Sequence, residues 1–517
     1  MIKRTLRFQY PPFKTYNLLK NRNGVMSKNI IVCCDGTCDK PDQKDDDGTV
    51  CPSNVWQLVC LVDTTDKNGN PQLSPKYLSG VGIDALDLNG KAFGDGVSKK
   101  IQEAYQWLGQ NYCSGDKIYF FGFSRGAFTV RSLGGMIKHC GLLDLSGLDD
   151  CDCPKRVAAA WTAYENNTKQ TKWAGDWAFH HQDDNSDNVK IQLLGVWDTV
   201  AAIGVPGKID DWFVNAKFHD LTLPDIVIHA RHAVAIDEIR ESFAPTLWLD
   251  ESGTPYGCQV LPAGRTVKQI WFPGVHCNVG GGYKDKGLSD GALRWMLEEA
   301  EETGLHFKPT AVVDLHPNCM GEIRDSRTGI FKVFNTLPRA IPPIENSDRI
   351  HRSAVDRQTD MPKTAGSYHQ PQRLQTGVPV TVQIEGAKEW NDTGLYLEAG
   401  AYYNFVATGQ WTWLKLPYNP DGSSALVQKE KIEEKVKLFL MPRNRDMDNF
   451  SLIGFVGNQG NPSLDGVTDG LDYFQIGNKL DHYFVPRSGY FYGYVNGRWG
   501  TYLECGGTVQ LTVTRIS

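Results

Sequence analysis

The sequence predicts a mostly parallel sheet covered by helices on both faces, followed by an all-β sandwich. Two observations predict this division. Up to about Leu374, short apolar runs alternate with segments that carry apolar residues at helical spacing, which is typical of parallel α/β domains. Beyond that point, short alternating runs are separated by Gly, Asn and Asp, which is typical of antiparallel sheets. We therefore expect an extension at 1–26, an α/β domain at 27–374 and a sandwich at 375–517.

The α/β domain is expected to alternate strands and helices along the chain. Ser53 is a candidate N-cap for the first helix, and Ser289 and Asp290 are candidates for the last one. The segment 201–261 has no regular pattern of apolar residues and carries several aromatic residues in an irregular setting. In chain order we expect strands at 29–34, 77–81, 117–121, 190–197 and 267–275, helices at 53–62, 98–113, 127–137, 154–164 and 292–302, and sandwich strands at 378–384, 402–409, 437–441, 490–495 and 508–514.

Composition excludes several classes of protein. The formal net charge of -6 and the lack of a long basic stripe argue against nucleic-acid binding. No apolar run is long enough to span a bilayer, and residues 1–24 lack the apolar core of a secretory signal. The 13 cysteines are odd in number and lack the spaced pairs of a zinc site. We expect reduced thiols, no metal and no cofactor.

A serine lies at a glycine-flanked turn, Gly122-Phe123-Ser124-Arg125-Gly126. An apolar run precedes this turn and a helical pattern follows it, so the serine is expected on a tight strand-to-helix bend. Such a bend needs small neighbours, because two larger side chains would force the strand and helix apart. The pattern is that of the nucleophile turn in α/β-hydrolases, and the alternative is an ordinary turn without chemistry.

Three residues at the ends of expected strands, Ser124, Asp198 and His276, form a candidate catalytic triad. Strand ends in a parallel sheet lie along one edge, and the order Ser, Asp, His is the order found in α/β-hydrolases. A serine needs a base, a histidine supplies one near neutral pH, and a carboxylate orients the imidazole. As alternatives, Asp198 caps a turn and His276 is a packed loop residue. The reserve acids are Asp237, Asp285 and Asp290, and the reserve base is His351.

Backbone donors are also required for the oxyanion that forms during acyl transfer. The N–H of Arg125 is one candidate, and Gly36 or Thr37 in an early loop is the other. Asp35 is assigned to the architecture of this loop. Trp212 and Phe213 are candidates for a lid or a substrate-binding wall, with plain core packing as the alternative.

These segments resemble the type VI secretion phospholipase effectors. The resemblance covers about 29–374 and rests on several motifs in one order. It implies an α/β-hydrolase whose Ser-Asp-His triad, here Ser124, Asp198 and His276, cleaves acyl esters of phospholipids. One departure is Cys277-Asn278, where the family often has a small residue and an aspartate. The motifs are Asp35-Gly36-Thr37, Gly122 to Ala127, Val196 to Val200, His232 to Glu238, Trp271 to His276, Gly280 to Tyr283 and Ile350 to Ser353.

The C-terminal part resembles the galactose-binding bacterial lectin sandwich, on segments such as Phe474 to Gly477 and Gly489 to Asn496. That family binds sugar through calcium. The corresponding positions here are Asn496, Leu503, Glu504 and Cys505, which form a poor oxygen shell for calcium. We therefore expect the sandwich to dock onto a membrane, a secretion component or the catalytic domain, with Trp499 and Tyr502 as exposed anchors.

The sequence thus favours a serine ester hydrolase, a phospholipase or lipase-type antibacterial effector that acts on membrane lipid. The expected partners are a phospholipid or other acyl ester, a membrane surface, a secretion-apparatus component or an immunity protein, and not nucleic acid. The expected location is the cytoplasm of the producing cell, with export that needs no signal peptide. The alternative is a surface- or glycan-binding protein whose hydrolase-like domain is catalytically silent.

Overall fold

The computed structural model describes most of the chain, and the account below is limited to those residues. The expected extension at 1–26 and the expected strand at 437–441 lie outside them. The described residues are 27–37, 39–80, 91–149, 151–168, 177–181, 189–200, 223–311, 313–328, 335–344, 348–360, 371–424, 442–458 and 473–517.

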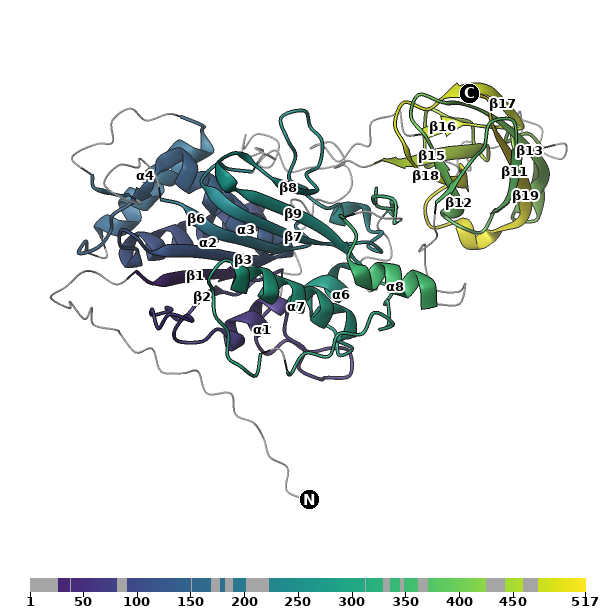
Figure 1. Cartoon of the computed structure of the whole chain (residues 1–517). Coiled ribbons are helices and arrows are strands. Elements are labelled where there is room, and N and C mark those ends of the chain that lie inside the picture. The colour runs from purple at the N-terminus through teal and green to yellow at the C-terminus, as the bar shows by residue number, and fades with distance from the viewer. Residues whose placement is uncertain are drawn as a thin grey trace, which may run out of the picture.

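A seven-stranded sheet organises the described part of the first domain (Figure 1). Its order is β2-β1-β3-β6-β7-β9-β8, and every neighbouring pair is parallel except the edge pair of β8 and β9. The strand ends therefore form one continuous edge. The strands are β1 Asn29–Cys34, β2 Lys76–Leu78, β3 Lys117–Phe123, β6 Ile191–Trp197, β7 Val227–Ala235, β8 Cys258–Val260 and β9 Thr266–Phe272.

Helices cover both faces of the sheet, because its central strands are apolar on both sides. In β1, for example, Ile30 and Val32 pack under α2, α3 and α4, whereas Ile31 and Cys33 pack on the opposite side with α1 and α7. Figure 1 shows the two groups of helices on opposite sides of the sheet. The helices are α1 Asn54–Leu61, α2 Lys91–Asn111, α3 Ser124–Cys140, α4 Asp152–Glu165, α6 His276–Gly280, α7 Gly287–Glu302 and α8 Arg352–Asp360, and a small antiparallel pair joins β4 Leu142–Leu143 to β5 Phe179–His180.

Two expectations for this domain were wrong. The segment 201–261, which was expected to be irregular, contains the nine-residue strand β7 between β6 and β9. The helix expected at 292–302 begins at Gly287 instead, with Lys286 as its N-cap residue and Ser289 and Asp290 inside its first turn. By contrast, Ser53 is the N-cap of α1, and its hydroxyl accepts a hydrogen bond from the N–H of Trp56.

The C-terminal part folds as a sandwich of two five-stranded sheets. One has the order β10-β12-β18-β15-β16, and the other has the order β11-β19-β13-β14 with β17 also paired to β13. Residues from both sheets, such as Phe491 and Phe405, form one apolar core between them. The strands are β10 Gln372–Arg373, β11 Pro379–Glu385, β12 Asn391–Leu397, β13 Tyr402–Trp413, β14 Leu416–Tyr418, β15 Leu452–Asn458, β16 Tyr473–Gln475, β17 Lys479–Phe484, β18 Gly489–Val495 and β19 Cys505–Arg515.

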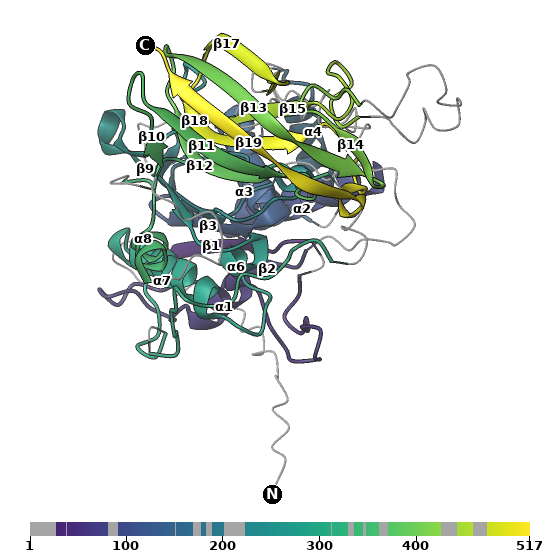
Figure 2. The same cartoon turned by 90° about the vertical axis from the view of Figure 1, so that its right-hand side faces the viewer.

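The sandwich packs against the first domain through the outer face of one of its sheets. Strand β18 is buried along its whole length. Its alternate residues Tyr490, Tyr492 and Tyr494 lie on the face away from the sandwich core. They form an apolar cluster with residues of the first domain such as Ile341 and Trp271. Figure 2, viewed from the sandwich side, shows the sandwich in front of the upper part of the first domain, with α1, α7 and α8 below it. Among the described helices, none has both the length and the apolar character needed to cross a membrane.

Candidate active site

Ser124 lies where β3 turns into α3 and has a left-handed backbone, with φ of 55°. This conformation is strained for a residue other than glycine and is often found at functional sites. The turn depends on its glycines: a Cβ on Gly126 would lie 2.1 Å from the carbonyl oxygen of Cys34, and a Cβ on Gly122 would lie 2.5 Å from that of Gly126. Only glycine allows the helix to start this close to the sheet.

The structure brings Ser124, His276 and Asp198 together from three strand ends. The hydroxyl of Ser124 donates to Nε2 of His276, with Oγ and Nε2 2.8 Å apart. The Nδ1–H of His276 donates to Oδ2 of Asp198 across 2.6 Å. All three side chains are buried, and Asp198 also has a left-handed backbone, with φ of 36°. The alternatives of a turn-capping Asp198 and a packed loop histidine therefore do not describe their main contacts.

Arg339 holds the carboxylate of Asp198 and was not predicted from the sequence. Its two terminal nitrogens donate to the two carboxylate oxygens, with Nη1–Oδ1 at 2.6 Å and Nη2–Oδ2 at 2.9 Å. The N–H of Ala235 adds a third donor to Oδ1. Burial alone would raise the pKa of Asp198, but Arg339 and then His276 outweigh burial and hold this pKa well below its usual value. Asp198 is therefore ionised at neutral pH.

Aromatic rings and a second carboxylate fix His276. The imidazole packs against Phe123 at 4.6 Å and meets the edge of Phe243 at 5.0 Å, between ring centroids. Its backbone N–H donates to Glu238, which is paired with Arg240. Burial lowers the pKa of His276 below its usual value, although the hydrogen bond to Asp198 acts in the opposite direction. The imidazole is thus neutral at pH 7, as a general base requires.

The early loop lies beside the serine, as expected. A Cβ on Gly36 would lie 3.2 Å from the Cβ of Ser124. Asp35 organises this loop: it accepts hydrogen bonds from Ser53, from Tyr77 and from the N–H of Gly36. Burial raises the pKa of Asp35 to about 6, while these hydrogen bonds act against the shift. The N–H of Gly36 is thus already engaged, and Thr37 follows it in the same loop. Its hydroxyl is buried and has no hydrogen-bond partner among the described residues.

The reserve acids have other partners. Asp237 accepts a hydrogen bond from the N–H of Gly274, Asp285 accepts one from that of Gly287, and Asp290 accepts one from that of His316. Each of these carboxylates binds the backbone of a loop or helix start, so each has a structural role in the observed contacts.

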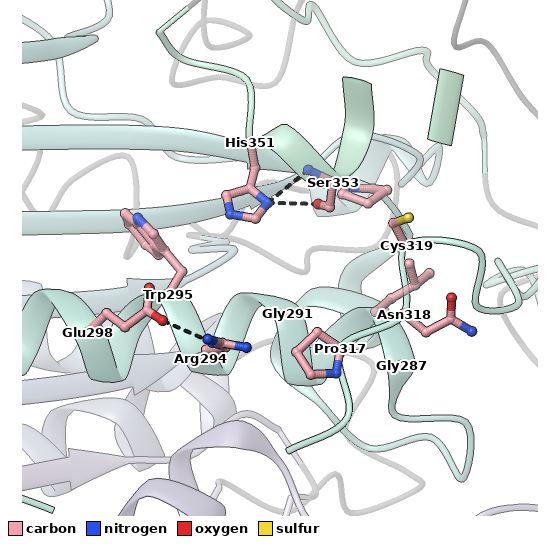
Figure 3. A pocket seen from close by; sticks show the side chains of 12 residues that line it. Gly287, Gly291, Arg294, Trp295, Glu298, Pro317, Asn318, Cys319, His351 and Ser353 are labelled. Carbon is pink, nitrogen blue, oxygen red and sulfur yellow. Dashed lines mark hydrogen bonds and ion pairs between the residues drawn. The ribbon is translucent and has the colours of Figure 1, made fainter. Parts of the chain in front are cut away.

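The reserve base His351 lies in a separate pocket of about 340 Å³ beside α7 (Figure 3). Its Nδ1 is bonded to the hydroxyl of Ser353, 2.7 Å away, and its ring stacks on Phe272. Burial lowers the pKa of His351 to about 4. The expected wall residues Trp212 and Phe213 lie outside the described residues.

A parallel sheet that presents a serine, an imidazole and a carboxylate in one hydrogen-bonded line at its strand ends defines the α/β-hydrolase class. The sequence model of the catalytic domain of T6SS Tle1-like phospholipase effectors matches residues 28–299, which is more than half of the chain. The chain belongs to this family. The family is one of phospholipase catalytic domains and hence of hydrolases.

Individual similar proteins match only part of this chain. The uncharacterized protein YEL023C of Saccharomyces cerevisiae is 30% identical over 237 residues, which are 42% of this chain and 32% of the yeast protein. The chain therefore spans about a third of that relative's length. An uncharacterized protein from Pseudomonas aeruginosa has a crystal structure with 17% identity and a TM-score of 0.33, covering 57% of this chain and 49% of that chain. The PllA-like lectin domain at the N-terminus of EclA has 18% identity and a TM-score of 0.19, covering 26% of this chain and 94% of the lectin.

Proposed function

We propose that this protein is a serine ester hydrolase that cleaves acyl esters of phospholipids. The observation that carries the proposal is the unbroken hydrogen-bond line from Ser124 through His276 to Asp198. The family match supports the lipid substrate, because the family is defined by phospholipase effectors. Family membership supports ester hydrolysis more strongly than it supports any one lipid head group or acyl position.

The reaction follows from the three side chains. Nε2 of His276 takes the proton of Ser124 as the serine oxygen attacks the ester carbonyl. The charged imidazole then returns this proton to the leaving alcohol, and an acyl-serine remains. A water molecule, deprotonated by the same nitrogen, cleaves the acyl-serine and restores the hydroxyl. Asp198 keeps Nδ1 protonated throughout and stabilises the imidazolium.

The oxyanion of each tetrahedral intermediate is assigned to two donors. The N–H of Arg125 belongs to the first turn of α3, directly after Ser124, where helix N–H groups face an anion. Thr37, next to Gly36 beside the serine, supplies the second donor through its N–H or its hydroxyl. The thiol of Cys277, although adjacent to His276, is no rival nucleophile, because burial raises its pKa to about 12.

The domain division proposed here is 27–374 for catalysis and 375–517 for the sandwich, with 1–26 as an extension. Strand pairing favours a boundary a few residues earlier, before Gln372, since β10 at Gln372–Arg373 already pairs with β12 of the sandwich. We assign the sandwich to docking and not to calcium-dependent sugar binding. Export as a type VI effector, action at a target membrane and neutralisation by an immunity protein are the partner relationships that this family suggests.

The test is hydrolysis by the purified full chain of a mixed phospholipid panel, with products identified by mass spectrometry. Ser124→Ala should lower the rate by on the order of 10⁴-fold or more and should retain the wild-type circular dichroism. A fluorophosphonate probe should label Ser124 of the wild type. Retained hydrolysis in the alanine variant would refute this site. Sugar binding by a wild type without esterase activity would favour the glycan-binding alternative.

A further inference from the structure

Arg339 makes four hydrogen bonds and is almost fully buried. Two of them hold Asp198 end-on, through both terminal nitrogens, and the other two bind main-chain carbonyls: Nη1 donates to Ala235 and Nη2 to Phe243, each across 2.6 Å. Phe243 is the residue whose ring makes the T-shaped contact with His276. One guanidinium group therefore fixes the plane of the triad carboxylate and the position of a ring that packs on the triad base.

Arg339 belongs to a segment, residues 335–344, that we call the strap. The strap lies outside the residues that match the family model, which end at 299. On one side it binds the catalytic domain: Thr336 forms a β-bridge with Arg240, and the N–H of Leu337 donates to the carbonyl of Ile239. No regular strand or helix is assigned within the strap. Its position is set by such individual contacts.

On its other side the strap binds the sandwich. The indole N–H of Trp390 donates to the carbonyl and hydroxyl oxygens of Thr336, at 3.2 and 3.1 Å. The hydroxyl of Thr336 donates to Glu389 at 3.0 Å. At the far end, the N–H of Ile344 donates to the hydroxyl of Tyr490, and the side chains of Ile341 and Ile344 enter the apolar cluster beneath β18. Arg339 is thus flanked on both sides by residues that bind the sandwich.

We propose that Arg339 is a positioning residue for the triad acid, and that the sandwich holds it in place through the strap. This inference rests on the proposed function of Ser124, His276 and Asp198. Since a bidentate guanidinium fixes both the orientation and the charge of a carboxylate, losing it misaligns Asp198 and leaves its charge uncompensated beside the imidazole. The sandwich then contributes to the rate of ester cleavage without touching the ester.

The experiment compares full-length variants on a short p-nitrophenyl ester across a pH range. Arg339→Met should lower kcat by about 10²-fold with little change in KM, because Asp198 loses its alignment. The acid limb of kcat/KM should move to higher pH, because the uncompensated carboxylate stabilises the imidazolium. Arg339→Lys, which keeps the charge but not the fork, should restore the pH profile more fully than the rate.

A second pair of variants tests whether the sandwich holds Arg339 in place, and it remains informative if Arg339→Met does not fold. The double variant Thr336→Val with Trp390→Phe removes the side-chain hydrogen bonds between Thr336 and the sandwich, and should lower kcat by about 10-fold. Thr381→Val is the matched control, because it removes a threonine hydrogen bond on the remote strand β11, and kcat should not change.

The outcomes separate the two proposals. If Ser124→Ala abolishes activity while folded Arg339→Met keeps the wild-type kcat and pH profile, the role of Arg339 is refuted and the proposed function stands. If the double variant has the same kcat as Thr381→Val, the sandwich does not fix the position of Arg339. A wild type that neither hydrolyses the ester nor reacts with a fluorophosphonate would overturn the proposed function, and the role of Arg339 with it.

Discussion

The backbone N–H of His276 donates a hydrogen bond to Oε2 of Glu238, with nitrogen and oxygen 3.3 Å apart. Glu238 is fully buried, and its carboxylate also accepts hydrogen bonds from the guanidinium and N–H of Arg240 and from the hydroxyl of Ser326. This one side chain therefore ties the first residue of α6 to the loop after β7.

Glu238→Gln should destabilise the protein. The amide keeps the shape of the side chain but leaves Arg240 buried without a full counter-charge, and breaking a buried ion pair costs about 3–5 kcal/mol when one partner is removed outright. We expect a loss of stability towards the lower end of this range, measured by urea denaturation. Glu398→Gln, which weakens partly exposed ion pairs with Arg373 and Arg515, is the control and should cost less than about 1 kcal/mol. Equal losses would contradict a special role for Glu238.

His276→Ala and His351→Ala should separate the two histidines. The first variant should be as inactive as Ser124→Ala, because the serine then lacks a base. The second should keep its rate on a soluble ester, since the observed partners of His351 are Ser353 and Phe272. Steady-state kinetics with matched circular dichroism provide the measurement. Loss of activity in the His351 variant alone would show that His351, and not His276, is the base.

Asp198→Asn should lower kcat by about 10⁴-fold, because an amide does not hold Nδ1 of His276 in its protonated form. The matched control is Asp237→Asn, which changes a nearby carboxylate that accepts a hydrogen bond from the N–H of Gly274. Comparable kcat losses in the two variants would argue for a general effect of charge removal.

The pH profile of kcat/KM should show an acid limb below the ordinary histidine value of about 6.5. Burial lowers the pKa of His276, so the imidazole keeps its ability to accept the serine proton until the pH falls through this depressed value. Activity is therefore retained at pH values somewhat below 6.5 and is lost as the pH falls through the depressed pKa of His276. Asp35→Asn should retain this limb, because Asp35 contacts the loop and not the imidazole. A limb that disappears in the Asp35 variant would assign the titration to Asp35.

Two helical glycines should respond to alanine in opposite ways. Gly126→Ala places a methyl group 2.1 Å from a backbone oxygen of β1, which cannot move without shifting the sheet, so little folded and active protein is expected. Gly291→Ala in α7 meets nothing within 4 Å and should stabilise the fold by about 0.5–1 kcal/mol. Thermal melts of both variants, with soluble yield, test the contrast. A wild-type melting temperature for Gly126→Ala would mean that the turn tolerates a side chain.

Calorimetric titration of the full chain with calcium and then galactose should give no micromolar binding. The amide of Asn496 is committed to the loop at 444–448: its oxygen accepts a hydrogen bond from Asn444, and its nitrogen donates to three carbonyls there. Leu503 is 97% exposed and offers no oxygen ligand in its side chain. Calcium binding that a chelator reverses, followed by sugar binding, would contradict this prediction.

Much of the fold was predictable because strand and helix periods are local. The serine strand, its helix and the Ser53 cap follow from spacing alone. The central strand β7 was missed, because its sequence Val-Ile-His-Ala-Arg-His-Ala-Val-Ala mixes polar and apolar residues on both faces. Those polar residues have buried partners that only the folded chain supplies: Arg231 pairs with Glu299, and Nε2 of His232 accepts the N–H of Thr199.

The predicted triad partners are brought into contact, whereas the groups around them could not be anticipated. Arg339 lies 141 residues from Asp198 in a segment without a periodic pattern, so no spacing rule links them. The prediction that Tyr502 is an exposed anchor was wrong. Tyr502 is buried, and its hydroxyl donates a hydrogen bond to the carbonyl of Val495. Trp499 is partly buried and stacks on Arg443, together with Trp390 and Tyr494. Sequence pattern marks an aromatic residue but does not reveal which of its faces is already occupied.

The packing of Phe123 and Phe243 around His276 has a consequence for motion. The imidazole is bonded at both nitrogens and contacts a phenyl ring on each of two sides, so a half-turn that exchanges Nδ1 and Nε2 requires breaking both bonds and displacing a ring. Ring reorientation is therefore expected to be slower than proton exchange along the hydrogen-bonded line. A proton captured at Nε2 therefore leaves through Nε2, on the side from which it came. The proton on Nδ1 stays with Nδ1 through every turnover.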